Sequence, residues 1–160
     1  MMQVVVKSKD DQETYDGCVL PTEESDIMET KNWMFNWHQE YVFPDRDILS
    51  LKVNGDPNVQ ALMSYEIDEG FVLIQLLESS PANAHSHGLK ITPTMLCCAA
   101  QISFDHHCGG FVAINIKLNR KLMAYYARYG AKPTPLKRMY FDTIDSNRLF
   151  DVYLKDKGAW

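Results

Sequence analysis

The chain has 160 residues, of which 46% are hydrophobic and 23% are charged, so it can bury a core without disulfides or a structural metal. These values exclude a disordered tail, a collagen-like chain and a small disulfide-stapled protein. The net charge of −5 argues against a general DNA- or RNA-binding protein.

The charge is divided unevenly along the chain. Residues 1–80 carry 16 acidic and 5 basic side chains, whereas residues 81–160 carry 5 acidic and 11 basic ones. Eight of the acidic residues lie between Asp10 and Glu29. This asymmetry favours partners of opposite charge on the two sides of one fold, and the alternative is that these eight acids form a solvated surface.

The N-terminal apolar run is too short for a signal peptide, and no stretch of about 18 apolar residues predicts a membrane span. Four cysteines occur without a C-x-x-C pair, and the histidines and cysteines between residues 85 and 108 lack the spacing of zinc ligands. We therefore expect a reduced, cytoplasmic protein with no metal and no membrane partner.

In chain order, the first half predicts mainly strands. Segment 3–7 could form a short strand, and the acidic segment 10–31 predicts a loop or a marginal helix. Segment 32–41 predicts a helix with an aromatic stripe at Trp33, Trp37 and Tyr41, which belongs to the core or to a ligand site. A meander of three strands with tight turns follows, at 47–53, 59–67 and 71–78.

The second half predicts alternating helices and strands. Segment 79–92 predicts a loop, after which Thr92 as N-cap and Pro93 begin a helix that ends at Gly109 and Gly110. The elements that follow are a strand at 111–117, a helix at 119–129, a strand at 138–144 and a last helix capped by Asp145 or Ser146. An apolar strip on the last helix (Leu149, Phe150, Tyr153) packs on the sheet or supports a homodimer.

The expected result is a single α+β domain over residues 1–160. It divides into an acidic N-terminal region (1–46), a core (47–144) and a C-terminal helix (145–160).

Two segments of the core could carry chemistry. The loop that enters the helix at Thr92 contains Gly88 and Lys90, and backbone N–H groups at a helix start suit phosphate; the alternative is a connection that binds nothing. The helix that begins near Asn119 carries Tyr126 seven residues later, where a tyrosine could donate a proton. The alternative for this tyrosine is a packed aromatic side chain.

Together these segments resemble the GNAT superfamily of acyl-CoA-dependent N-acyltransferases. The family pattern N-x-x-A-x-x-x-Y-x-x-x-G-F is matched at Asn119, Tyr126 and Gly130, with Leu and Ala in place of its Ala and Phe. The family pattern (R/Q)-x-x-G-x-(G/A), which enters the preceding helix, is altered. The resemblance covers residues 47–144 and lies in the order of the elements more than in either motif.

The altered motif is the one that holds the pyrophosphate in the family. His87 replaces its Arg or Gln, and Lys90 and Thr92 replace its glycines. Glycine lets the backbone approach a phosphate closely, so these replacements bear directly on cofactor binding.

The resemblance implies a mixed, mostly antiparallel central sheet flanked by helices, with the cofactor between strands 71–78 and 111–117. Acetyl-CoA or another acyl-CoA is then the co-substrate. The residues implied to contact it are Leu76, Leu77, Glu78, His87, Gly88, Leu89, Lys90, Ile91, Thr92, Asn119 and Tyr126.

The resemblance also implies the chemistry. Backbone amides near Leu77 would polarise the thioester carbonyl, and Tyr126 would protonate the leaving thiolate. Glu78 is the first candidate for the base that takes the ammonium proton, and Glu66 is the second.

The expected function is an N-acetyltransferase that acts on a small cationic metabolite or a protein amine, with the basic half facing the cofactor and the acidic half facing the amine. The alternative is a catalytically degenerate GNAT-like module that binds a protein partner. A toxin-type enzyme acting on charged tRNA is a third reading, against which the acidic first half argues.

Overall fold

The computed structural model describes residues 1–116 and 119–155. In this part of the chain nine strands form one sheet in the order β6-β1-β2-β3-β4-β5-β7-β9-β8. The strands are β1 (Met2–Ser8), β2 (Thr14–Pro21), β3 (Asp47–Val53), β4 (Ala61–Asp68), β5 (Phe71–Ser79), β6 (Leu89–Lys90), β7 (Val112–Asn115), β8 (Lys132–Pro133) and β9 (Arg138–Phe141). Every pair of neighbouring strands is antiparallel except β5 and β7, which are parallel.

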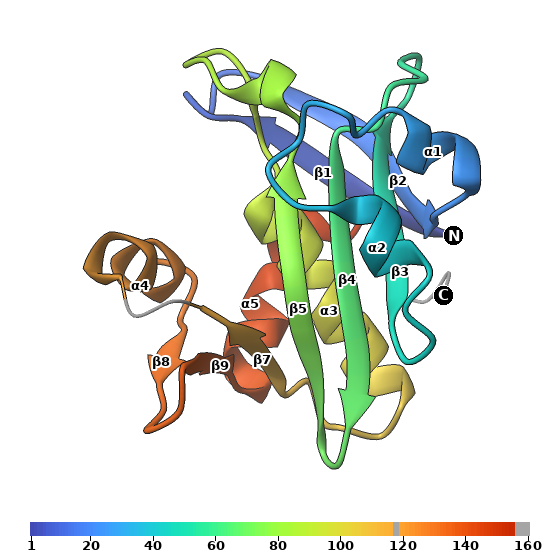
Figure 1. The fold of residues 1–160 in the computed structure, drawn as a ribbon. Helices are drawn as coiled ribbons and strands as arrows, with labels where there is room; N and C mark the ends of the chain where they lie inside the picture. The colour runs from blue at the N-terminus through green and yellow to red at the C-terminus, as the bar shows by residue number, and fades with distance from the viewer. Residues whose placement is uncertain (117–118, 156–160) are drawn as a thin grey trace.

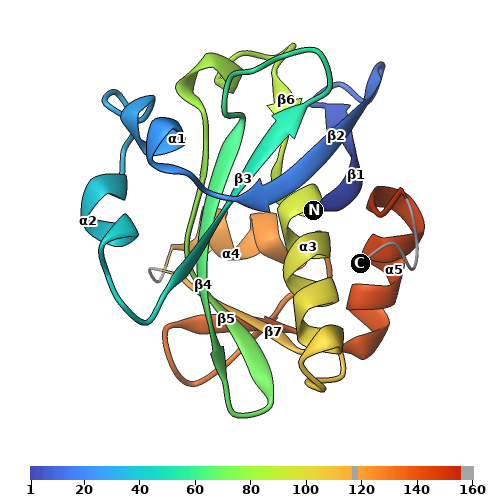
Figure 2. The same ribbon diagram turned by 90° about the vertical axis from the view of Figure 1, so that its right-hand side faces the viewer.

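Helices cover both faces of this sheet (Figures 1 and 2). They are α1 (Glu24–Met28), α2 (Trp37–Tyr41), α3 (Thr92–Asp105), α4 (Arg120–Ala127) and α5 (Thr143–Tyr153), with a short 3₁₀ turn η1 (Pro81–Asn83). Figure 2 shows α3 and α5 on one face and α1 and α2 on the other. The larger apolar core lies under α3, α5 and α4, and a smaller one around Trp37 lies under α1 and α2.

The predicted fold class is confirmed. The chain forms one mixed, mostly antiparallel sheet flanked by helices, with β3, β4 and β5 as a meander and α3 as the crossover between the parallel strands β5 and β7. The continuous apolar run of β5 has its physical reason here, because this strand is central and is covered on both faces.

The prediction for residues 10–31 is confirmed only in part: α1 is a short helix, but the segment also contains the strand β2 between β1 and β3, which the sequence pattern does not predict. Within β2 only Gly17 and Val19 are buried, so the alternation that identifies a strand covers just two positions.

The predicted helix at 32–41 is also wrong in extent. Only Trp37–Tyr41 is helical, and Trp33 lies in the turn before it. The backbone N–H groups of Met34 and Phe35 donate to a distant carboxylate, and the Asn36 side chain caps the helix by accepting from the Gln39 N–H at 3.1 Å. Trp37 is fully buried whereas Tyr41 is 41% exposed, so the aromatic stripe is not one surface.

The N-caps of α3 and α5 lie at least one residue before the predicted ones. α3 includes Thr92, which is buried in its first turn, and its N-cap is Ile91. α5 begins at Thr143, and its capping box joins Asp142 to Asp145.

The apolar strip of the last helix packs inward. Leu149 and Tyr153 are buried in the larger core, and the ring of Phe150 lies 5.4 Å from that of Phe104. Of the two alternatives for this strip, packing against the sheet is the one that the structure shows. The predicted ends at residue 117 and at 156–160 lie outside the described residues. No helix in the described ranges combines the length and hydrophobicity needed to cross a membrane.

Candidate functional site

The parallel strands β5 and β7 separate in the middle of the sheet (Figure 1). They pair at three positions, from Val72–Val112 to Ile74–Ile114, and β5 then continues to Ser79 beyond the end of β7. At the same point the register of β5 with β4 shifts by one residue, which makes Gln75 the extra residue of a β-bulge. We call the edge of β5 at residues 75–79, which pairs with no strand on the β7 side among residues 1–116 and 119–155, the β5–β7 gap.

Backbone geometry directs the Leu77 amide into this gap. The Ser80 N–H donates to the Gln60 carbonyl on the β4 side at 2.9 Å. Successive backbone amides of a strand point to alternate edges, so the Glu78 amide also faces β4 and the Leu77 amide faces the gap. An N–H group directed into such an edge is suited to polarise a carbonyl oxygen.

Glu78 lies beside this amide but is already bonded to the chain. Its carboxylate accepts from the N–H of Met34 at 2.6 Å, from the N–H of Phe35 at 3.0 Å and from the Trp37 Nε1–H at 2.9 Å. The side chain therefore ties β5 to the turn before α2, and in this arrangement it is an anchor.

Glu66 differs from Glu78 in that its carboxylate has no partner in the part of the chain that the structure describes. It is half-buried on β4 opposite Leu73, one position before the last paired residue of β5. Among residues 1–116 and 119–155 it has no hydrogen bond or ion pair. Of the two predicted bases, Glu66 is the one available to accept a proton.

Tyr126 lies on α4, whose first turn is capped by the Asn119 side chain accepting from the N–H groups of Lys121 at 2.9 Å and Leu122 at 3.3 Å. The residue is 7% exposed and packs into the same core as Leu77. Burial raises the pKa of its phenol above the ordinary value, so the proton stays on the oxygen at neutral pH.

The hydroxyl of Tyr126 has no partner among residues 1–116 and 119–155. It makes no hydrogen bond within the described part of the chain. A protonated, unpartnered hydroxyl of this kind can act as a donor.

The predicted phosphate loop is bonded to itself. The N–H of His87 donates to His85 Nδ1 at 3.1 Å, that of Gly88 to the His85 carbonyl at 3.0 Å, and that of Leu89 to Asn83 Oδ1 at 3.2 Å. Leu89 and Lys90 form β6 on the edge of β1. Three of the amides proposed for phosphate are therefore occupied.

Glycine at position 88 has a packing reason instead. A Cβ atom added there would lie 2.3 Å from the Asn83 carbonyl oxygen, so the loop can close on η1 only with glycine.

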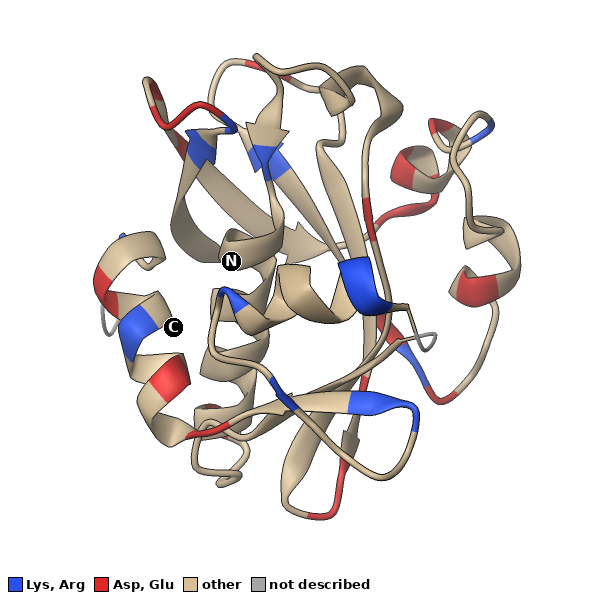
Figure 3. Ribbon diagram, turned by 90° about the vertical axis from the view of Figure 1, so that its left-hand side faces the viewer, with Lys and Arg blue, Asp and Glu red and all other residues tan. Residues whose placement is uncertain are grey.

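The charges near this loop contradict the expected division into an acidic and a basic half. Lys90 Nζ pairs with Asp11 at 2.6 Å, and Asp10 lies 3.5 Å from His87. In Figure 3 the acidic turn between β1 and β2 lies apart from the acidic helix α1. Some of the acidic side chains of the N-terminal region thus lie against the predicted phosphate loop, where Asp11 neutralises the charge of Lys90.

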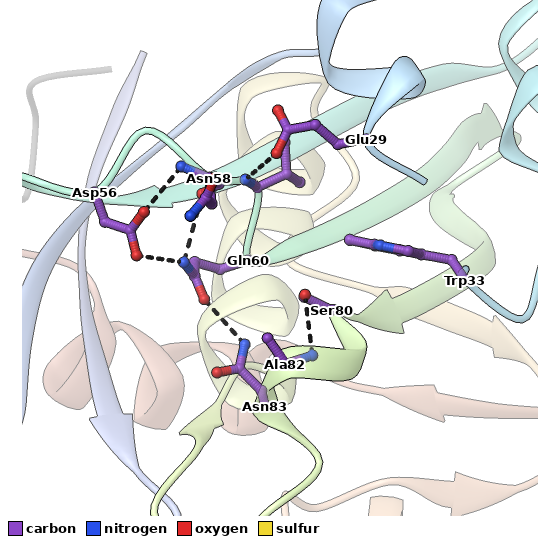
Figure 4. Close-up of a pocket in the computed structure, with 9 residues that line it drawn as sticks. Glu29, Trp33, Asp56, Asn58, Gln60, Ser80, Ala82 and Asn83 are labelled. Carbon is purple, nitrogen blue, oxygen red and sulfur yellow. Dashed lines mark hydrogen bonds between the residues drawn. The ribbon is translucent and has the colours of Figure 1, made fainter. Parts of the chain in front are cut away.

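A polar cavity of about 300 Å³ lies at the end of β5 (Figure 4). Its walls include Trp33 and the carboxylates of Glu29 and Asp56. Gln60 donates to Asp56 at 3.0 Å and accepts from Asn83 at 3.0 Å, which fixes the floor. Among the residues that line the cavity none is basic, so it is suited to a positively charged group.

The sequence patterns missed a row of polar side chains at the mouth of the gap. Gln75, Asn115 and Arg138 lie on three adjacent strands and are hydrogen-bonded in series. The only local signal is that Asn115 interrupts an apolar run. Within the described ranges no group of three or more His, Cys, Asp or Glu side chains is placed to hold a metal ion.

No family model matches the chain, and no curated protein matches it. Solved structures do match. A mutant form of the spermidine N-acetyltransferase SpeG from Vibrio cholerae has a TM-score of 0.58 and 13% identity over 82% of this chain and 97% of its own. An acetyltransferase of the GNAT family from Listeria monocytogenes has a TM-score of 0.55 and 12% identity over 79% of this chain and 95% of its own.

A third neighbour extends over more of the chain. The structure described as a KacTA–DNA complex has a TM-score of 0.55 and 16% identity over 93% of this chain and 99% of its own. At such identities the likeness concerns the arrangement of the backbone. The strand order, the parallel pair that separates and the crossover helix agree with it, and the chain therefore has the fold of the GNAT acetyltransferases.

Proposed function

We propose that the chain is an N-acyltransferase that transfers an acyl group from acetyl-CoA or another acyl-CoA to a primary amine. The observation that carries the proposal is the β5–β7 gap, with the Leu77 amide directed into it and a protonated Tyr126 in the adjoining core. GNAT-family acetyltransferases are among the proteins that share this fold.

In the proposed reaction the amine nitrogen attacks the thioester carbonyl carbon, a C–N bond forms and the C–S bond breaks. The Leu77 N–H stabilises the negative charge on the carbonyl oxygen. The leaving sulfur takes the proton of Tyr126, and the carboxylate of Glu66 takes the proton lost by the amine through a chain of water molecules.

The acceptor is a cationic amine. The cavity of Glu29, Trp33 and Asp56 can hold a second ammonium group by charge and by contact with the indole face. It borders Ser80, three residues beyond Leu77, which at the rise of a strand is about 10 Å from the reacting carbonyl. One fold neighbour is a spermidine N-acetyltransferase, and a diamine of this reach fits the two positions.

The occupied amides of His87, Gly88 and Leu89 favour a second candidate function, a catalytically inactive module of the same fold that binds a protein partner. With these amides bonded internally and Lys90 neutralised, the loop does not fit a pyrophosphate as it stands. We therefore expect the acyl-pantetheine limb of the co-substrate to contribute most of its affinity.

Titration of the purified protein with acetyl-CoA, followed by its thermal unfolding, tests the proposal. An increase in Tm at millimolar acetyl-CoA, with acetylation of a diamine detected by thiol release, supports it. No increase with any acyl-CoA would leave the binding module as the function.

Tyr126→Phe separates catalysis from binding. We expect turnover to fall about 100-fold or more, the usual size of a general-acid contribution, while the acetyl-CoA affinity stays unchanged. Tyr125→Phe is the matched control, because this neighbouring ring lies 5.5 Å away, edge to face, and has no proposed role in proton transfer. Equal turnover in the Tyr126 variant and the wild type would remove Tyr126 from the mechanism.

A further inference from the structure

Three side chains form a hydrogen-bonded row across β5, β7 and β9. Asn115 Nδ2 donates to Gln75 Oε1 at 2.6 Å, and Arg138 Nε donates to Asn115 Oδ1 at 3.1 Å. Asn115 and Arg138 are direct partners in the antiparallel β7–β9 ladder. We call these three residues the 75–115–138 row.

The direction of each hydrogen bond in this row is determined by Arg138. A guanidinium group can only donate, so Asn115 must turn its carbonyl oxygen toward Arg138 and its NH₂ group toward β5. Gln75 must then present its own carbonyl oxygen. Both hydrogen bonds of the row therefore run in the same direction, with the first donor on β9 and the last acceptor on β5.

The row lies where the backbone pairing stops. The last backbone pair of β5 with β7 is Ile74–Ile114, and Gln75 and Asn115 are the next residue on each strand. Gln75 is also the extra residue of the bulge against β4, so its backbone is outside the regular register there. Among the described residues, the side-chain bond between Gln75 and Asn115 is the last link between the two strands before the gap opens.

We propose that the 75–115–138 row is a clasp that sets where β5 and β7 separate and holds the bulge of β5 in place. Because Leu77 follows two residues after Gln75, the clasp keeps the Leu77 amide directed into the gap. Gln75 and Asn115 are thus positioning residues for acyl transfer, an inference that rests on the proposed function.

Substitutions of nearly equal size test the clasp. Gln75→Glu keeps the link, because the new carboxylate still accepts from Asn115. Asn115→Asp also keeps it, because its carboxylate accepts from Arg138 and Gln75 can rotate its amide to donate. The double variant Q75E/N115D places two carboxylates face to face and breaks the link.

The matched control places a similar carboxylate pair elsewhere. Gln101 Nε2 donates to Asp105 at 3.0 Å on the exposed side of α3, so Gln101→Glu creates two facing carboxylates far from the gap. This control separates the clasp from a general effect of added negative charge.

The first measurement is amide hydrogen exchange at residues 72–75 and 112–115 by NMR, which requires no enzyme activity. Loss of one such hydrogen bond should raise exchange there about tenfold in Q75E/N115D, with both single variants and Q101E within about threefold of the wild type. Unchanged exchange in the double variant would overturn the clasp.

The second measurement is steady-state kinetics with acetyl-CoA. We expect kcat to fall about tenfold or more in the double variant, because the Leu77 amide is no longer held toward the reacting carbonyl. The KM for acetyl-CoA should rise as well, because the acyl-pantetheine limb binds in the gap that the clasp sets. Faster exchange with an unchanged kcat would overturn the positioning role. If the wild type transfers no acyl group, the proposed function fails, and the exchange comparison still decides whether the clasp holds the two strands.

Discussion

Removal of the Glu78 carboxylate should destabilise the whole fold, because this side chain ties β5 to the turn before α2. Glu78→Ala leaves three N–H donors without their acceptor. Met34 is 83% exposed, so its N–H regains water, whereas Trp37 is fully buried and its indole N–H does not. The Phe35 N–H is intermediate in exposure.

The expected cost follows from these three environments. A hydrogen bond to a charged acceptor contributes about 1.5–3 kcal/mol when it is protected from water and less when it is exposed. We therefore expect Glu78→Ala to lower the free energy of unfolding by about 3 kcal/mol. For a chain of this length that corresponds to a decrease in Tm of about 6–12 °C.

Glu78→Gln is the matched variant. Phe35 and Trp37 both donate to the same carboxylate oxygen, and the amide oxygen of glutamine can keep both bonds. Only the acceptor of the Met34 N–H is lost, so the expected cost is about 1 kcal/mol.

Urea denaturation followed by tryptophan fluorescence measures both variants. A Glu78→Ala protein within about 0.5 kcal/mol of the wild type would refute the reasoning. Loss of turnover in Glu78→Gln with unchanged stability would instead return Glu78 to the role of catalytic base.

Three further outcomes are expected. Gly130→Ala should lower the free energy of unfolding by more than about 2 kcal/mol, because φ is +99° and the new Cβ would lie 2.3 Å from a carboxylate oxygen of α5. Gly70→Ala, at φ +84° with nothing within 4 Å of the new Cβ, should cost only about 1 kcal/mol. Similar losses of stability for the two variants in urea denaturation would contradict this reasoning. The pKa of Asp142 is lowered to about 2, first by the backbone N–H that its carboxylate caps and then by a lysine. The contribution of this carboxylate to stability is therefore present above pH 4 and is lost as the pH falls toward 2. The decline in Tm over this range should be shallower in Asp142→Asn than in the wild type, and equal declines would show that Asp142 does not contribute. Burial raises the pKa of Cys97 to about 12, so its thiol stays protonated and unreactive at pH 8. Alkylation of the native protein at pH 8, measured by mass spectrometry, should label the half-buried Cys18 and leave Cys97 unmodified. Equal labelling of the two cysteines would show that α3 opens.

Much of the fold is predictable from local patterns. The meander β3–β4–β5, the strand β7 and the helix capped by Asn119 each follow from a periodicity or a cap within a short window. The prediction is wrong where the signal is weak, as in β2, and where a distant group competes with the helix. The N–H groups of Met34 and Phe35 bond to Glu78 and so leave the helix predicted for them.

The candidate site is predictable in its elements and not in its chemistry. The sequence places Tyr126 and Leu77 on the two elements beside the gap, and the structure packs both into one core. It ranks Glu78 above Glu66 as a base, yet the folded chain bonds Glu78 to three donors and leaves Glu66 free in the described residues. No local pattern distinguishes two glutamates on neighbouring strands.

The charged residues show the same limit to prediction from the sequence. The sequence alone establishes an acidic first half and a basic second half, and local patterns predict most of the strands and helices in order, because each of these depends on residues that are close in the chain. Only the tertiary structure brings Asp11 onto Lys90, 79 positions away, and Glu78 onto the turn at Met34, 44 positions away. Whether a charged group is neutralised, anchored or free depends on such long-range contacts, and these decide which side chains remain available for catalysis.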